Sequence, residues 1–154
     1  MRTNNNRLLI EQLDKKIEKF SAINENDIPS VGWIHSIRTA MNMSLAQLAK
    51  KLGKTVPTTR EIEEREANQG ITLNKLNEVA GALGFRLVYG LVPNDSSLET
   101  MIDRKALETA KEIVMRTSHS MKLEDQENRQ TRLDKAILDK AEDIKRELPR
   151  YLWD

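Results

Sequence analysis

The chain has 154 residues, with 25 Lys and Arg against 24 Asp and Glu and a net charge of +1. It contains no cysteine and two histidines, which excludes disulfides, thiolate metal sites and a histidine-based ligand cluster. No apolar run approaches the roughly 20 residues that span a bilayer, and the opening "MRTNNNRLLIEQLDKK" becomes charged too soon for a signal peptide. We therefore expect a cytoplasmic protein without a membrane segment.

The composition favours a mainly α-helical fold, because charged residues make up 32% of the chain and aromatic residues only 4%. Residues 7–20 carry apolar side chains at helical spacing, and the following "NENDIPSVG" contains residues that end helices. We interpret residues 1–30 as an N-terminal helix and a linker. The apolar positions of this helix are Leu8, Leu9, Leu13, Ile17 and Phe20.

Residues 31–84 contain four closely spaced helical patterns, "WIHSIRTAM", "SLAQLAKKL", "VPTTREIEERE" and "LNKLNEVAGAL". Ser44 and Thr72 are placed as N-caps of two of these helices, and Gly53 and Gly84 stand just after helix ends. The stretch "SLAQLAKKLGKTVPTTREIEE" thus consists of one short helix, a tight turn and a second helix. This is the arrangement of a DNA-binding helix-turn-helix.

Residues 85–93 are predicted to contain the one β-strand of the chain. Apolar residues alternate in "FRLVYGLV", with Phe85, Leu87, Tyr89 and Leu91 on one face, and Pro93 ends the pattern. A lone strand needs a partner for its backbone groups, and the simplest partner is the same segment of a second chain. This predicts a homodimer through residues 85–92. Two alternatives remain, which are pairing with a short strand near the N-terminus and packing as extended chain.

Residues 94–154 are predicted to form a C-terminal helical region. Residues 96–126 and residues 132–148 each show helical periodicity, and their many charges are interpreted as solvated faces. The chain ends in "YLWD", which places Tyr151 and Trp153 in the last four positions. We expect this tail to pack back on the protein or on a partner.

The sequence gives no sign of catalysis. It contains no Ser/His/Asp set, glycine-rich phosphate loop, metal cluster or paired carboxylates in a plausible pocket. The chain is therefore not expected to be an enzyme, and no cofactor or metal is expected.

The segment "IRTAMNMSLAQLAKKLGKTVPTTREIEERE" resembles the helix-turn-helix of phage-repressor or XRE-type regulators, over about residues 33–84. The resemblance implies a five-helix repressor domain that binds double-stranded DNA at a palindromic operator. It also implies a structural ion pair between Arg38 and Glu63. Two residues depart from the pattern. Thr59 stands where the family usually has Val or Ile, and Pro57 restricts the residue before it, so the entry to the recognition helix is expected to shift by up to one residue.

The same resemblance implies which residues contact DNA. An arginine of the recognition helix suits guanine, a glutamate suits cytosine, and a valine suits the thymine methyl group. The residues implied to contact base edges are Val56, Pro57, Arg60 and Glu61. Those implied to contact phosphates are Ser44, Gln47, Lys50, Lys51, Lys54, Thr55 and Thr58. Residues 31–70 hold six Lys and Arg against four Asp and Glu, a small basic excess. The alternative is a fold of this type that has lost DNA binding.

A wider series of segments, including "GWIHSIRTAMNMSLAQLA", "ITLNKLNEVAGALGFRLVYGLVP" and "YLWD", is similar to the family called mobile mystery protein A, over nearly residues 31–154. Members of that family are paired with a Fic-domain protein. The similarity implies an autoregulating antitoxin of a Fic-type toxin-antitoxin pair. The alternative is an antitoxin that inhibits a Fic adenylyltransferase through protein contacts alone.

Some Fic enzymes are silenced by a helix with the motif [ST]-x-x-x-E-[GN]. The stretch "SAINEN" fits this motif with Ser21, Glu25 and Asn26. Its glutamate is implied to neutralise a phosphate-binding arginine of the Fic partner. A second stretch, "SMKLED", matches through Ser120 and Glu124 and misses the last position. The alternative interpretation of Glu25 is a solvated acid at a frayed helix end.

Overall fold

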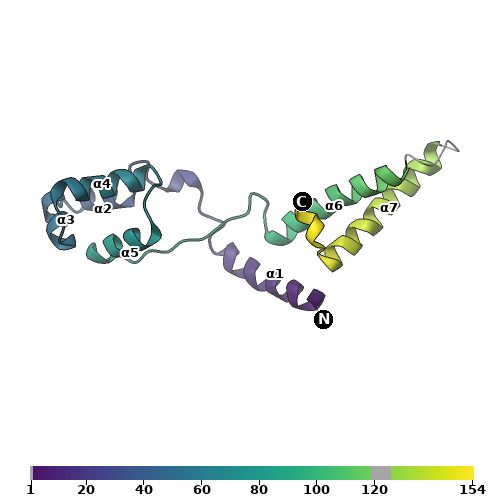
Figure 1. Ribbon diagram of the computed structural model, residues 1–154, viewed down its shortest axis with the longest axis horizontal. Helices are drawn as coiled ribbons and strands as arrows, with labels where there is room; N and C mark the ends of the chain where they lie inside the picture. The colour runs from purple at the N-terminus through teal and green to yellow at the C-terminus, as the bar shows by residue number, and fades with distance from the viewer. Residues whose placement is uncertain (1, 119–125) are drawn as a thin grey trace. The chain divides into compact units, whose positions relative to one another are not determined.

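The computed structural model describes residues 2–118 and 126–154. Within these residues the chain forms seven α-helices and two short 3-10 helices and no β-strand (Figure 1), which confirms the mainly helical fold. None of the described helices combines the length and the apolar character needed to cross a bilayer. The chain divides into two compact units, which are treated separately below. We call residues 23–90 the central unit, and residues 1–22 with 91–154 the terminal unit.

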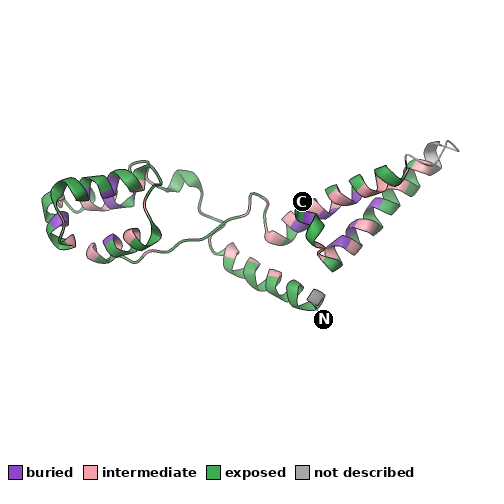
Figure 2. Cartoon of the chain, viewed as in Figure 1, coloured by how far each residue is buried: buried purple, intermediate pink, exposed green. Residues whose placement is uncertain are grey.

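The central unit consists of four helices around one apolar core. They are α2 (Trp33–Ala40), α3 (Leu45–Leu52), α4 (Val56–Ala67) and α5 (Leu73–Ala82), preceded by the 3-10 helix η1 (Glu25–Asp27). Each α-helix coincides with one of the four patterns seen in the sequence. Buried positions lie on the inner faces of these helices (Figure 2). The core contains Ile34, Leu48, Ile62, Val79 and Leu83.

Local side-chain contacts set the helix ends of the central unit, as the sequence predicted. The Ser44 hydroxyl accepts a hydrogen bond from the Gln47 backbone N–H at 3.1 Å, and the Gln47 side chain accepts from the Ser44 N–H at 2.8 Å. This reciprocal pair is a capping box. Thr72 caps α5 through its hydroxyl, which accepts a hydrogen bond from the Lys75 N–H at 3.2 Å. Gly53 ends α3 with a φ of 63°, in the left-handed region that glycine adopts without steric cost.

The terminal unit contains α1 (Arg2–Glu18), α6 (Leu98–Ser118), α7 (Gln126–Glu147) and the 3-10 helix η2 (Arg150–Trp153). Helices α6 and α7 run side by side along most of their length (Figure 1). Small residues at the contact allow the two helix backbones to approach closely. The buried residues here are Ala106, Ala110, Ile137, Ala141, Ile144 and Leu152.

A carboxylate of α1 caps the first turn of α6. The two oxygens of Asp14 accept hydrogen bonds from the backbone N–H groups of Leu98 and Glu99, at 2.8 and 3.1 Å. The first N–H groups of a helix have no partner within the helix, and a negative charge there also interacts favourably with the helix dipole. Asp14 therefore joins two segments that lie 84 residues apart in the sequence.

The C-terminal tail packs on α6, as expected, and does so through Leu152. Leu152 of η2 is fully buried, whereas Tyr151 and Trp153 are 46% and 53% exposed. Successive residues of a 3-10 helix point about 120° apart, so a single position in this short helix faces the core. The medium-sized Leu152 occupies that position, and the two aromatic residues stay about half exposed.

Replacing Leu152 by Ala is expected to lower the free energy of unfolding of the terminal unit by about 2–5 kcal/mol, because a fully buried leucine leaves a cavity. Chemical denaturation followed by circular dichroism measures the change. The matched control is Trp153→Ala, which removes a larger but half-exposed side chain. Equal losses for the two variants would contradict the anchoring role of Leu152.

Residues 85–93 do not form the predicted β-strand. They are neither helical nor paired within the described part of the chain, and run as a single uncoiled segment between α5 and α6 (Figure 1). A strand is defined by hydrogen bonding to a neighbouring strand, and the described residues of one chain supply no such neighbour. The alternating pattern correctly excluded a helix here but did not provide a partner.

Candidate nucleic-acid interface

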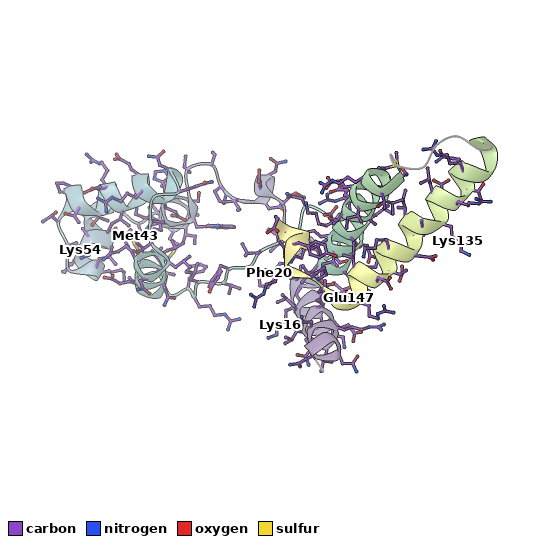
Figure 3. The ribbon with its side chains drawn as sticks, turned by 45° about the vertical axis from the view of Figure 1, so that its right-hand side comes forward. Lys16, Phe20, Met43, Lys54, Lys135 and Glu147 are labelled. Carbon is purple, nitrogen blue, oxygen red and sulfur yellow. The ribbon has the colours of Figure 1, made fainter. Side chains whose placement is uncertain are left out.

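The turn between α3 and α4 is short and held by Thr55. This residue is the N-cap of α4, where its hydroxyl accepts a hydrogen bond from the Thr58 N–H at 3.3 Å and lies 2.8 Å from the Thr58 hydroxyl oxygen. Figure 3 shows the side chains of the central unit, with Met43 before α3 and Lys54 after it labelled. The two helices are thus joined by three residues, of which Gly53 is in the left-handed conformation.

Pro57 does not delay the start of α4. The helix begins at Val56, so Pro57 is its second residue. The first four N–H groups of a helix have no partner within it, and a proline there loses no intrahelical hydrogen bond. The one-residue shift expected from the sequence is therefore absent, and Thr55 is the N-cap as implied.

Thr59 packs inward at the position where a larger aliphatic residue was anticipated. Its side chain is fully buried, and its hydroxyl donates a hydrogen bond to the Thr55 carbonyl oxygen at 2.9 Å. A buried hydroxyl is costly only when it lacks a partner. Thr59 therefore substitutes for an aliphatic residue without leaving an unsatisfied polar group.

The residues implied to contact bases share one exposed face of α4. All four are exposed, with Arg60 four residues after Val56 and Glu61 four residues after Pro57. Glu61 pairs with Arg65 one turn later. Arg60 lines a shallow hollow together with the exposed carboxylate-bearing Glu64 of the next turn.

The residues implied to contact phosphates divide between two environments. Gln47, Lys50 and Lys51 lie around one hollow beside the α2–α3 loop, and all three are exposed. Lys54 is half-buried, and the pKa of Glu78 is lowered first by its hydrogen bond from Lys75 and also by the charge of Lys54. The hydroxyls of Ser44, Thr55 and Thr58 are exposed but take part in helix capping.

Arg38 and Glu63, expected as an ion pair, form one between α2 and α4. The Arg38 side chain binds both carboxylate oxygens of Glu63 and also donates to the Met43 carbonyl oxygen at 2.9 Å. His35 Nδ1 lies 3.0 Å from the same carboxylate. The side chains of Arg38 and Glu63 are only 12% and 9% exposed. Burial alone would raise the pKa of Glu63, but the hydrogen bonds and charges of Arg38 and His35 outweigh it and lower the pKa.

A second glutamate of α4, which the sequence did not single out, holds the other end of α2. The carboxylate of Glu66 accepts hydrogen bonds from the backbone N–H groups of Trp33 and Ile34, both at 2.8 Å. The N-cap of α2 is Gly32, which has no side chain to perform this role. A Cβ atom on Gly32 would lie 2.9 Å from a Glu66 oxygen. A helix beginning directly after glycine was the only signal in the sequence that a distant acceptor was required.

The acidic residues of α4 therefore serve two purposes. Glu63 and Glu66 bind α2 within the central unit, whereas Glu61 and Glu64 face solvent. Arg60 of α4 and Lys50 and Lys51 of α3 are exposed as well. The acidic sequence of α4 consequently overstates the negative charge that its outer face presents to a ligand.

The motif implied to inhibit a Fic enzyme is not placed on one continuous helix. Helix α1 ends at Glu18, and Ser21 follows in a turn where its hydroxyl donates to the Glu18 carbonyl oxygen at 2.6 Å. Glu25 is exposed and begins the separate 3-10 helix η1, which also contains Asn26. The second match, with Ser120 and Glu124, lies outside the described residues.

Within residues 2–118 and 126–154 no group of three His, Asp or Glu side chains is arranged to hold a metal ion. Comparison with known proteins gives no further assignment. No protein-family model, curated protein or solved structure matches the chain.

Proposed function

We propose that the chain is a sequence-specific DNA-binding transcriptional regulator of the phage-repressor type, in which α3 and α4 act as a helix-turn-helix. The observation that carries the proposal is the division of α4 into two faces. Its inner face contains the buried Thr59, Ile62 and Glu63, and its outer face presents Val56 and Arg60. A recognition helix requires this combination, because one side is held by the domain while the other enters the major groove.

The proposed binding divides affinity and specificity between the two helices. Lys50 and Lys51 on α3 supply sequence-independent attraction to phosphates, which accounts for most of the affinity and its dependence on salt. Arg60 on α4 supplies a bidentate contact to guanine. A palindromic operator would engage two copies of the chain, one on each half-site.

Fluorescence anisotropy with the DNA upstream of the gene, measured at several salt concentrations, tests the proposal. Arg60→Ala is expected to weaken binding to the preferred sequence by about 1–3 kcal/mol and to relax specificity at one base pair. Lys50→Ala is expected to weaken binding to all sequences similarly and to reduce the salt slope by about 1. Arg132→Ala, an exposed change on α7, is the control. Binding that is absent, or equally strong in all three variants, would refute the proposal.

A second proposed role is restraint of a Fic-domain partner, as the similarity to mobile mystery protein A implies. The exposed carboxylate of Glu25 supports it, because such a group must be accessible to pair with an arginine of another protein. If the chain restrains the partner through protein contacts alone, this role requires no DNA binding. Co-expression of the partner with the Glu25→Gly variant tests the residue. We expect adenylylation to be released, and unchanged suppression would rule out Glu25 as the inhibitory group.

A further inference from the structure

Residues 85–92 form an exposed apolar segment that the proposed DNA contact does not use. Phe85 is 51% exposed, Val88 62%, Tyr89 70% and Leu91 86%. Single exposed apolar residues are common on protein surfaces, but a contiguous group of this size usually marks an interaction site. The segment is therefore a candidate contact surface.

The backbone of this segment is also unpaired. The Phe85 N–H donates to the Ala80 carbonyl oxygen at 2.8 Å, which finishes α5. From residue 86 to residue 92, no backbone–backbone hydrogen bond forms with any part of the chain that the structure describes. A row of free N–H and C=O groups in an uncoiled segment is a template for pairing with another strand. Many kinds of partner can cover an apolar patch, whereas only an extended chain can pair with these backbone groups.

An apolar groove adjoins the segment within the central unit. Its volume is about 350 Å³, and its lining includes Trp33 and Ile37 of α2, Leu76 of α5, and Phe85 and Val88 of the segment. Of these lining residues, Trp33 is about half exposed. Residues 85–88 and the groove thus form one continuous apolar face within the central unit.

We propose that a second copy of this chain covers this face, with residues 85–92 of the two copies paired as antiparallel strands beside both grooves. Arg86 is the only charged residue of the segment. Antiparallel pairing places the two Arg86 side chains near opposite ends of the ladder, whereas a parallel pair would set them side by side at a cost. The same segment serves on both copies, so the interface is closed and limits assembly to a dimer.

This inference goes beyond the proposed function and does not depend on it, because no DNA takes part in the contact. A chain that dimerises through residues 85–92 but ignores DNA would keep the inference and overturn the proposed function. A chain that binds DNA but does not dimerise through residues 85–92 would keep the proposed function and overturn the inference. A foreign strand on the same face is the competing occupant, and failure of the purified chain to crosslink above the control in the experiment below would favour it over the dimer.

The absence of cysteine makes a single-cysteine scan possible, in which each introduced thiol is the only one in the chain. Cysteine is placed in turn at Arg86, Val88, Tyr89 and Val92, and the purified full chain is oxidised at micromolar concentration. Disulfides form when the two Cα atoms lie within about 4.4–6.8 Å. Antiparallel pairing predicts crosslinking that peaks at one central position, 88 or 89, where the side chain faces its own copy, and falls toward both ends. The control is cysteine at Glu112, an exposed position on α6.

Uniform crosslinking at all four positions would overturn the antiparallel arrangement, and yields no higher than at Glu112 would overturn the dimer. Sedimentation equilibrium provides the second measurement. Val88→Pro removes a backbone donor and is expected to raise the dimer dissociation constant roughly tenfold or more. Val88→Thr keeps the donor and the β-branched shape, and should leave the dimer nearly unchanged. A Val88→Pro chain with unaltered association and unaltered helix content would contradict the pairing.

Discussion

Replacement of Glu63 by Gln is expected to lower the free energy of unfolding of the central unit by about 3 kcal/mol. The change leaves the shape of the side chain intact but removes the negative charge that Arg38 and His35 surround. The Arg38 guanidinium, 12% exposed, would then lie within the unit without a counter-charge. Loss of one partner of a buried pair is costly for this reason, even where the pair itself contributes little net stability. Urea denaturation at pH 7 measures the loss.

The same substitution should remove a pH dependence of stability. Since the pKa of Glu63 is lowered in the folded chain, the folded state binds its proton less readily than the unfolded state. The stabilisation is fully present above the unfolded pKa of about 4.3 and is lost as the pH falls through the folded value. The difference in stability between the natural chain and Glu63→Gln should therefore shrink as the pH is lowered below about 4. Glu64→Gln, an exposed change one residue away, should show no such difference.

Substitution of Gly32 by Ala is expected to destabilise the central unit by about 2–3 kcal/mol. Gly32 has φ 87° and ψ 160°, a conformation that residues with a Cβ atom rarely adopt. The added methyl group would also lie 2.9 Å from the Glu66 oxygen and push that carboxylate away from α2. Two backbone N–H groups, those of Trp33 and Ile34, would lose their acceptor. Thermal and chemical unfolding of the single variant give the total cost.

A double-mutant cycle separates the two causes. In a chain that already carries Glu66→Ala, the Gly32→Ala change should cost only the backbone strain, about 1–2 kcal/mol. The matched control is Gly81→Ala in α5, where no atom lies within 4 Å of the added Cβ and alanine should stabilise the helix by roughly 0.5–1 kcal/mol. If Gly32→Ala were as harmless as Gly81→Ala, the close contact with Glu66 would not limit the structure.

Features that depend on neighbouring residues were predictable from the sequence. The caps at Ser44 and Thr72 and the left-handed Gly53 lie where the sequence placed them, because each involves side chains and backbone groups within one helical turn. The pairing of Arg38 with Glu63 came from a resemblance, which supplied a contact between residues 25 positions apart. The local pattern was enough to predict the caps and the conformation of Gly53, but not the ion pair between Arg38 and Glu63.

Features that depend on distant segments were missed. Glu66 binds backbone groups 32 and 33 residues earlier, and Asp14 caps a helix that begins 84 residues later. No local pattern specifies such contacts, because only the packed fold brings the groups together. The prediction of a strand at residues 85–93 was wrong for a related reason. Alternating apolar residues describe a single strand, whereas the hydrogen bonds that define a strand require a second one. The sequence predicted that the tail packs back but not that Leu152 is its buried residue, because that depends on which side chain of the short 3-10 helix faces α6.

The order of the two units along the chain has a consequence for limited proteolysis. The central unit is inserted between α1 and α6, so it is covalently attached to the terminal unit at both of its ends. A single cut in either connecting segment produces a nicked chain and releases neither unit. Two cuts free the central unit, and then α1 remains with α6 only through packing and the two hydrogen bonds of Asp14. The terminal unit would survive such digestion as a complex of two fragments.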